Sequence, residues 1–324
     1  MTPDAAGVKF MSPTSTDDAR RILAAATPAI DSPTQKLNLS GDQLALVFDR
    51  GFRRPEWVWE ARDSDGRSLG VVAGWGGPDF PAPRILDVVA VPLEGHEVGV
   101  QLLNRAIEES AALGTPRIEI IQFAPAVDPL MDDGVIATRA LIEACDYRML
   151  VQRFRYELVV ADSRPNIPPT RLRFESVASA DDPRLEQIMA ELLVGSLDAH
   201  DIAALATGDL AAVARETVAE YAGLDPIESF FLAIDESNDV VGLVIGGMRT
   251  SRDRGVASFI GVSHRHRGRG YAGQLLGFIT ARIIDQGARL IIGETDQGNV
   301  PMAKAFTFVG YPQTESRIDF VPAE

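Results

Sequence analysis

The chain of 324 residues contains one pattern of residues twice, and this repeat is the strongest constraint on its fold. The stretch "VKFMSPTSTDDARRIL" begins at Val8, and "LRFESVASADDPRLEQI" begins at Leu172, 164 positions later. Tyr147 and Tyr311 keep the same spacing near the ends of the two copies. Each stretch predicts a short strand, a polar turn with helix N-cap residues, and a helix. We therefore expect two copies of one domain.

The middle of each copy predicts further matching elements. "WVWEARDSDGRSLGVVAGW" and "SFFLAIDESNDVVGLVIGG" each place a polar turn between two apolar strands, which is typical of a β-hairpin. A third strand and a helix follow, and the two helices end at Gly114 and Gly287, a common C-terminal signal. Another strand, a helix and a final strand complete each copy. The expected fold class is α+β, with two tandem domains, each a mixed, mostly antiparallel sheet flanked by helices.

The domain borders follow from the repeat and from one proline-containing segment. We place the first domain at residues 1–160 and the second at residues 171–324. The segment between them, "ADSRPNIPPT", occupies residues 161–170 and contains three prolines. Because proline disfavours helix and central strand, we expect this segment to be a stiff linker.

Composition excludes several classes of protein. The hydrophobic fraction of 46% and the charged fraction of 24% are typical of a globular protein. No apolar run reaches the roughly 18 residues that a membrane span needs, and the start of the chain has no signal-peptide pattern. With a single cysteine, Cys145, the chain fits a reducing compartment, so we expect a cytoplasmic protein without membrane contact. The net charge of −15 argues against nucleic acid as a partner.

A basic, glycine-containing loop, "HRHRGRGYAGQLL", occupies residues 264–276 of this acidic chain. It lies between a strand predicted to end near Val262 and a helix predicted to start near Tyr271. The first turn of a helix has unpaired N–H groups and about half a positive charge, and therefore binds anions. Glycines allow the backbone to approach a phosphate closely. The loop predicts a phosphate site, and a solvated basic turn is the alternative.

The glycines of this loop also spell G-x-G-x-x-G, the fingerprint of nicotinamide dinucleotide sites. That reading requires the first glycine directly after the strand, yet five residues separate Val262 from Gly268. Only 30 residues follow Glu294, too few for the rest of a doubly wound sheet. An NAD(P)-dependent oxidoreductase is therefore our third hypothesis.

The spelling R-x-x-G-x-G, formed by Arg265, Gly268 and Gly270, resembles the GNAT superfamily of acetyl-CoA-dependent N-acetyltransferases. The family's second signature is an asparagine after the next strand, then a helix that ends in glycine and an aromatic residue. Asn299, in "NVPM", and the pair Gly310-Tyr311 match it. The resemblance implies that the loop wraps the pyrophosphate of acetyl-CoA. It assigns cofactor binding to Val262, Arg265, Arg267, Gly268, Arg269, Gly270, Tyr271, Ala272 and Asn299.

The first copy departs from this pattern. Its equivalent loop, "PLEGHEVG", has Glu94 and Glu97 where the second copy has arginines, and carboxylates repel a pyrophosphate. Val135 stands at the asparagine position. We therefore expect a degenerate first copy and one working site, in the second copy. The tandem arrangement is similar to that of mycothiol synthase, but no residue carries that enzyme's substrate over.

The resemblance also implies the catalytic groups. In the family, a backbone N–H at the position of Val262 hydrogen-bonds the thioester carbonyl, where negative charge develops. Glu294 occupies the position at which the similar ribosomal-protein alanine acetyltransferases have a general base. A solvated glutamate at the strand end is the alternative, and Asp296 is the nearest substitute. The family's acid, a tyrosine, is replaced here by Phe306, which donates no proton.

The leading hypothesis is an enzyme that transfers an acetyl group from acetyl-CoA to a primary amine of a small molecule or peptide, with no metal ion. The second hypothesis is a catalytically silent acyl-CoA-binding protein with a regulatory role, because Phe306 cannot act as an acid.

Overall fold

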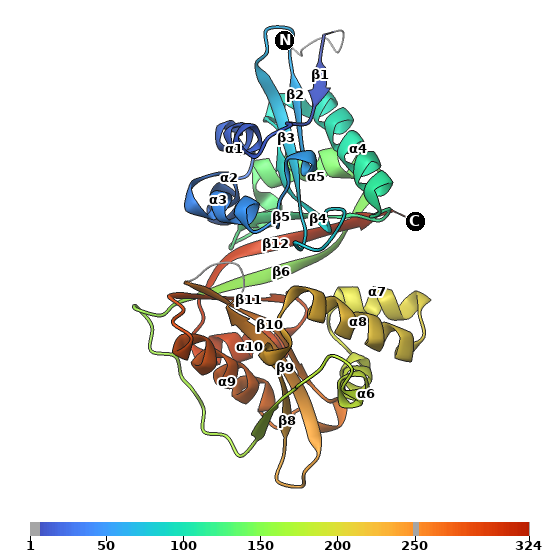
Figure 1. The fold of residues 1–324 in the computed structure, drawn as a ribbon. Coiled ribbons are helices and arrows are strands. Elements are labelled where there is room, and N and C mark those ends of the chain that lie inside the picture. Colours follow the sequence, from blue (N-terminus) through green and yellow to red (C-terminus); the bar gives the residue numbers. More distant parts are fainter. Residues whose placement is uncertain (1–6, 249–252, 324) are drawn as a thin grey trace. The chain divides into compact units, whose positions relative to one another are not determined.

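The computed structural model describes residues 7–248 and 253–323, and the chain divides into two compact units (Figure 1). Unit 1 comprises Met1–Gln152 with Glu315–Glu324, and unit 2 comprises Arg153–Thr314. The border at Gln152 lies inside the last strand of the first repeat, so the compact units do not follow the repeats residue by residue. The domain borders at 160 and 171 describe the repeats and stay a prediction.

Unit 1 contains a mixed sheet with helices on both faces. Its elements are β1 (Lys9–Met11), α1 (Thr16–Ala25), α2 (Pro33–Leu39), α3 (Gly41–Asp49), η1 (Pro55–Trp57), β2 (Val58–Arg62), β3 (Ser68–Trp75), β4 (Ile85–Ala90), η2 (Leu93–Gly95), α4 (His96–Leu113), β5 (Glu119–Pro125), η3 (Pro129–Met131), α5 (Asp133–Glu143), the start of β6 (Tyr147–Val159) and most of β12 (Gln313–Pro322). The strand order is β1-β2-β3-β4-β5-β12. Neighbouring strands are antiparallel except the parallel pair β4 and β5.

Unit 2 repeats this arrangement. Its elements are the rest of β6, β7 (Arg173–Ser176), α6 (Pro183–Leu193), α7 (Ala199–Thr207), α8 (Leu210–Leu224), η4 (Ile227–Ser229), β8 (Phe230–Ile234), β9 (Val240–Met248), β10 (Arg254–Val262), η5 (His264–His266), α9 (Tyr271–Asp285), β11 (Leu290–Asp296) and α10 (Val300–Val309). The strand order is β6-β11-β10-β9-β8-β7, and only β10 and β11 are parallel. The predicted α+β class, the mixed sheets and the hairpins are confirmed.

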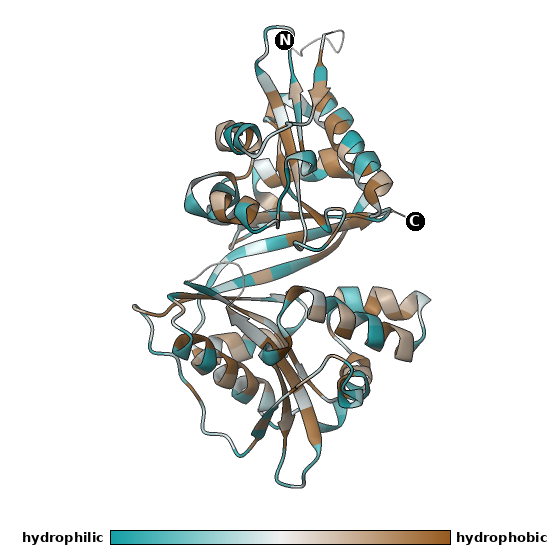
Figure 2. Cartoon of the chain, in the orientation of Figure 1, coloured by the Kyte–Doolittle hydropathy of each residue, from teal (hydrophilic) through white to brown (hydrophobic). Residues whose placement is uncertain are grey.

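Each sheet has a hydrophobic core on both faces, and the helices carry apolar and polar stretches side by side (Figure 2). In unit 2, α9 and α10 cover one face, while α6 and α8 cover the other. The apolar face of α9 is buried, since Leu275, Leu276, Ile279 and Ile283 are each 0% exposed. Burial of each such side chain stabilises the fold by about 2 kcal/mol relative to exposure.

The last strands of the two repeats are exchanged between the units. In unit 2, β11 pairs antiparallel with β6, the last strand of the first repeat, in a register that joins Leu290 to Val159 and Asp296 to Arg153. In unit 1, β5 pairs antiparallel with β12, the last strand of the second repeat. The neighbour of β11 therefore comes from the first half of the sequence.

The predicted linker lies against unit 2. Residues 163–170 form neither helix nor strand, as their prolines predict. The N–H of Asn166 donates to the carbonyl of Val309 at 2.9 Å, and Thr170 Oγ1 donates to Gln274 Oε1 at 2.7 Å. In the described part of the chain, no helix has the length and apolar character needed to cross a membrane.

Candidate functional site

Strands β10 and β11 separate towards their carboxyl ends. Their parallel pairing runs from Arg254 opposite Leu290 to Ala257 opposite Gly293 and stops there. At the same point the register of β10 against β9 shifts between Ala257 and Phe259, which is the mark of a β-bulge. Beyond the bulge, β10 continues to Val262 and β11 to Asp296. The separation leaves strand backbone available to a ligand that enters between the two strands.

Val262 is the last residue of β10, and its backbone N–H points into the gap between β10 and β11. The N–H of the next residue, Ser263, donates to the carbonyl of Val241 at 2.9 Å, towards β9. Backbone groups of successive residues in an antiparallel pair point to alternate sides. The N–H of Val262 therefore points away from β9, to the side on which β11 lies, as its predicted role requires.

The glycines of the basic loop hold a backbone conformation that other residues adopt with strain. Gly268 has φ +79° and Gly270 has φ +76°, both left-handed. A Cβ atom built on either residue would meet nothing within 4 Å, so space is open beside the backbone. Gly270 is also the N-cap of α9, and a glycine has no side chain that could cap the helix. The first N–H groups of α9, beginning with those of Tyr271 and Ala272, therefore receive no hydrogen bond acceptor from the N-cap residue. An open, uncapped helix start beside left-handed glycines fits a phosphate.

Two of the three predicted arginine ligands already contact α6 and the residues that follow it. Arg267 donates to three backbone carbonyls, those of Gly195 at 2.6 Å, Leu192 at 3.1 Å and Val262 at 3.2 Å. Arg265 forms an ion pair with Glu191, whose other oxygen accepts a hydrogen bond from Ser263 Oγ at 2.6 Å. Arg269 is exposed and has no polar partner within the described residues. Arg267 thus fixes the loop, while the charge of Arg269 remains open to a ligand.

Asn299 and Phe306 both have structural contacts in α10. Asn299 caps the helix, because its Oδ1 accepts from the N–H of Met302 at 3.2 Å. Phe306 is 1% exposed and stacks on Tyr156 with ring centroids 4.4 Å apart. Its ring also fills the space that a side chain at Gly293 would occupy. The position of the family's acid is therefore part of the core.

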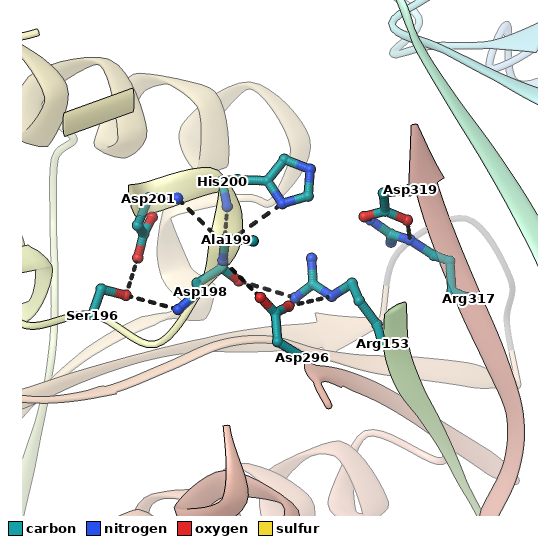
Figure 3. Close-up of polar contacts among 9 residues, drawn as sticks. All are labelled: Arg153, Ser196, Asp198, Ala199, His200, Asp201, Asp296, Arg317 and Asp319. Atoms are coloured by element: carbon teal, nitrogen blue, oxygen red, sulfur yellow. Dashed lines mark hydrogen bonds and ion pairs between the residues drawn. The ribbon is translucent and has the colours of Figure 1, made fainter. Parts of the chain in front are cut away.

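The segment between α6 and α7 connects the ends of the two separated strands. Its first part is held at Gly195 by Arg267, next to the end of β10. Its last part is held at Ala199, whose N–H donates to Oδ2 of Asp296 at 2.7 Å, at the end of β11 (Figure 3). The segment and the first turn of α7 therefore border the gap between the carboxyl ends of β10 and β11.

Two arginines of β6, from the first repeat, pair with the carboxylates at the end of β11. Arg155 Nη1 lies 2.6 Å from Glu294 Oε1, and these residues also face each other in the sheet register. Arg153 lies between two aspartates, with Nε 3.1 Å from Asp296 Oδ1 and Nη2 3.2 Å from Asp198 Oδ2 (Figure 3). Glu294 is thus an ion-paired side chain, 16% exposed, and not a solvated strand-end glutamate.

Asp201, in the first turn of α7, differs from these carboxylates. It accepts a hydrogen bond from Ser196 Oγ at 2.6 Å and has no ion pair with a basic side chain within the described residues. Burial, reinforced by the negative charge of Asp198, raises the pKa of Asp201 to about 6. Burial also opposes the charge of Asp198, but His200 and the Arg153 guanidinium outweigh it and hold the pKa of Asp198 well below its usual value. No motif marks Asp201 in the sequence.

The equivalent region of unit 1 has no open, left-handed glycine loop. Gly95, in the loop before α4, has φ −97° and is not left-handed. A Cβ on Gly95 would lie 3.2 Å from the side chain of Val91, and one on Gly99 would lie 2.8 Å from it. Gln122, at the position of Glu294, is 1% exposed and bonded to Gln35 at 3.0 Å. Side chains of the unit itself occupy the region that is open in unit 2.

Comparisons with known proteins agree with this geometry. A model of the acetyltransferase (GNAT) family matches residues 200–311. A GCN5-related N-acetyltransferase from Sphaerobacter thermophilus has a similar structure, with a TM-score of 0.63, 16% identity, and coverage of 99% of this chain and 96% of that chain. A tandem GNAT protein from the clavulanic acid biosynthesis pathway has a TM-score of 0.54 at 14% identity, with coverage of 97% and 98%. A search of curated proteins found no match.

At these identities the structural likeness shows the fold, and the family model matches the segment that carries the site. A model of the GNAT acetyltransferase family thus matches the segment 200–311, and the chain along its whole length has the fold of tandem GNAT proteins.

Proposed function

We propose that unit 2 transfers an acetyl group from acetyl-CoA to a primary amine of a small-molecule or peptide acceptor. The observation that carries the proposal is the combination, in unit 2, of separated strands β10 and β11 with an open, left-handed glycine loop at the start of α9. Its equivalent in unit 1 is filled by side chains. The backbone N–H groups after Gly268 and Gly270 would hold the pyrophosphate, and Arg269 would add charge. Arg265 and Arg267 would support binding by fixing the conformation of the loop. Their guanidinium groups would also reach the phosphate if they left their present partners.

In the proposed reaction, the amine nitrogen bonds to the thioester carbon and the carbon–sulfur bond breaks. The N–H of Val262 stabilises the negative charge that develops on the carbonyl oxygen. Glu294 accepts the proton that the amine loses, and Arg155 fixes the position of that carboxylate. The thiolate of coenzyme A leaves without an acid from Phe306, which is tolerable because a thiol has a pKa of about 8.5.

A catalytically silent acyl-CoA-binding protein is the second candidate, and the buried ring of Phe306 favours it. Release of free thiol from acetyl-CoA in the presence of a panel of amines separates the two, because only the enzyme turns over.

Ligand-dependent melting should identify the cofactor without knowledge of the acceptor. A ligand that binds only the native state adds about 2.7 kcal/mol at 100 times its Kd, which raises the melting temperature by several degrees. We expect coenzyme A and acetyl-CoA in large excess to stabilise the protein, and NAD and NADP to have no effect. Calorimetric titration should then find one site per chain, with affinity that falls as salt rises.

Two results would contradict this proposal. Stabilisation by NADP without stabilisation by coenzyme A would favour the dinucleotide reading of Gly268, Gly270 and Gly273. Two equal coenzyme A sites per chain would show that the loop of unit 1 is functional.

The carboxylates around Ser196 should give stability a distinct pH dependence. The folded-state pKa of Asp201, about 6, lies above its ordinary value of 3.8, so the folded state binds the extra proton. Stability from this group is present below pH 4 and is lost as pH rises to 6. The unfolding free energy of Asp201→Asn should therefore exceed that of wild type, and this difference should grow by about 1 kcal/mol from pH 5 to pH 8.

Asp198→Asn is the matched control, because the shift of Asp198 has the opposite sign. That variant should lose stability at pH 8. Urea denaturation at both pH values measures the two effects, and a change of the same sign in both variants would contradict the assignment.

A further inference from the structure

Three side chains with metal-binding atoms, one of them from the basic loop of unit 2, lie close together. Asp235 and Asp239 lie at the two ends of the turn between β8 and β9, and His266 is the last residue of η5. One ligand atom from each residue lies within 4.8 Å of the other two. None of the three has a part in the proposed acetyl transfer.

The turn between β8 and β9 holds both aspartates in fixed positions. Oδ1 of Asp235 accepts from the N–H groups of Ser237 at 2.9 Å and Asp239 at 3.0 Å. The N–H of Asp235 donates to the carbonyl of Asp239 at 3.0 Å, which closes the turn. One oxygen of Asp235 and both oxygens of Asp239 are not used by the turn.

The first repeat shows which of these residues the turn itself requires. Its equivalent turn has Asp63 at the first position, where Oδ1 accepts from the N–H groups of Asp65 at 3.0 Å and Arg67 at 2.8 Å. The N–H of Asp63 likewise donates to the carbonyl of Arg67 at 3.0 Å. Arg67 stands where the second repeat has Asp239. The turn therefore needs its first aspartate but not a carboxylate at its end, so the charge of Asp239 has no role in the hairpin.

His266 presents a buried nitrogen without a partner. Its Nδ1 is shielded from solvent and has no hydrogen bond within the described residues. Buried polar atoms of native proteins nearly always have a partner, which is a protein group, an ordered water or an ion. Nearby, His264 differs, because its Nδ1 lies 3.2 Å from the carbonyl of Glu191.

The surrounding basic side chains do not neutralise the two aspartates. Arg171 pairs with Glu236 at 3.8 Å, and Arg173 bonds to Glu175 and Asn238, each at 2.9 Å. Within the described residues, neither Asp235 nor Asp239 forms an ion pair with a basic side chain. Two carboxylates and an imidazole whose Nδ1 has no partner thus share one small region, and no basic side chain of the described residues pairs with either carboxylate.

We propose that Asp235, Asp239 and His266 bind a divalent transition-metal ion of the Zn²⁺ or Mn²⁺ class, which departs from the sequence expectation of no metal. One imidazole nitrogen and two carboxylate oxygens are ligands that such ions accept, and hard ions without affinity for nitrogen fit less well. Ligands around Zn²⁺ lie about 3.3 Å apart in tetrahedral geometry, so the three atoms move together slightly on binding. The bound ion joins the β8–β9 hairpin to η5, two residues before Gly268.

Direct metal binding tests the proposal without any assay of activity. Full-length protein, freed of affinity tag and treated with chelator, is titrated with Zn²⁺ by calorimetry and with Mn²⁺ by electron paramagnetic resonance. We expect one site per chain and a metal-dependent rise in melting temperature. His266→Gln should weaken binding by about tenfold or more, the effect that even an outer-sphere partner of a metal ligand has.

Asp239→Arg supplies the residue that the first repeat has in this turn, and should abolish metal binding while melting as wild type does in chelator. His264→Gln is the matched histidine control and should bind metal as wild type does. Equal affinity of wild type and His266→Gln, or no stoichiometric binding by wild type, would overturn the proposal.

Discussion

Gly270→Val should abolish binding of coenzyme A, with affinity reduced by at least about 100-fold, while most of the fold survives. Gly270 has φ +76°, which a β-branched residue adopts only with strain of about 1–3 kcal/mol. The space beside it is open in the structure, so the variant folds around the new side chain. That same space is where we place the pyrophosphate. Calorimetric titration of coenzyme A measures the loss, and thermal melting measures the fold.

Gly287→Val is the control for backbone strain. Gly287 follows the C-terminal end of the same helix, α9, and has φ +93° with nothing within 4 Å of a built Cβ. It should cost similar stability and leave affinity for coenzyme A unchanged. Gly99 of the first repeat is unsuitable as a control, because its Cβ would lie 2.4 Å from Leu141. Equal loss of affinity in both variants would show that strain, and not the loop, decides binding.

The local features of the site could be predicted from sequence because short-range signals determine them. The strand was expected to end near Val262 and the helix to start near Tyr271, and β10 and α9 have these ends. Gly268 and Gly270 predicted a loop whose backbone approaches a ligand closely, and both adopt the left-handed conformation that other residues rarely adopt. The repeat predicted two related strand arrangements, and each compact unit contains one.

The partners of the charged residues could not be predicted, because they depend on contacts far apart in sequence. The last strands of the two repeats occupy equivalent places, and no local signal decides which of them pairs with β11. As β6 does so, Arg153 and Arg155 reach Asp296 and Glu294. In the same way, Arg267 donates to the backbone carbonyls of Leu192 and Gly195. Every residue has a backbone carbonyl, so the sequence does not indicate which ones accept these hydrogen bonds.

Glu294→Gln should lower kcat by roughly 100-fold, the usual loss for a general base, with affinity for acetyl-CoA little changed. Glutamine keeps the shape of the side chain but cannot take the proton from the amine. The substitution also removes the ion pair between Glu294 and Arg155. The measurement therefore needs a control variant that removes a charge beside Arg155 and leaves Glu294 intact. Steady-state kinetics with an accepted amine gives kcat, and titration gives the affinity.

Glu157→Gln provides that control, because Glu157 also pairs with Arg155, 3.1 Å from its Nη2, and faces Ile292 in the sheet. If Glu294 acts as the base, Glu157→Gln keeps kcat within a few-fold of wild type. Equal losses in the two variants would mean that an undisturbed Arg155 is what the reaction needs.

Full activity of Glu294→Gln would instead transfer the role of base to Asp201, because Asp296 is held by Arg153 and by the N–H of Ala199. The pKa of Asp201, about 6, places it close to the pH at which a base must work, and the double variant Glu294→Gln/Asp201→Asn would then be inactive.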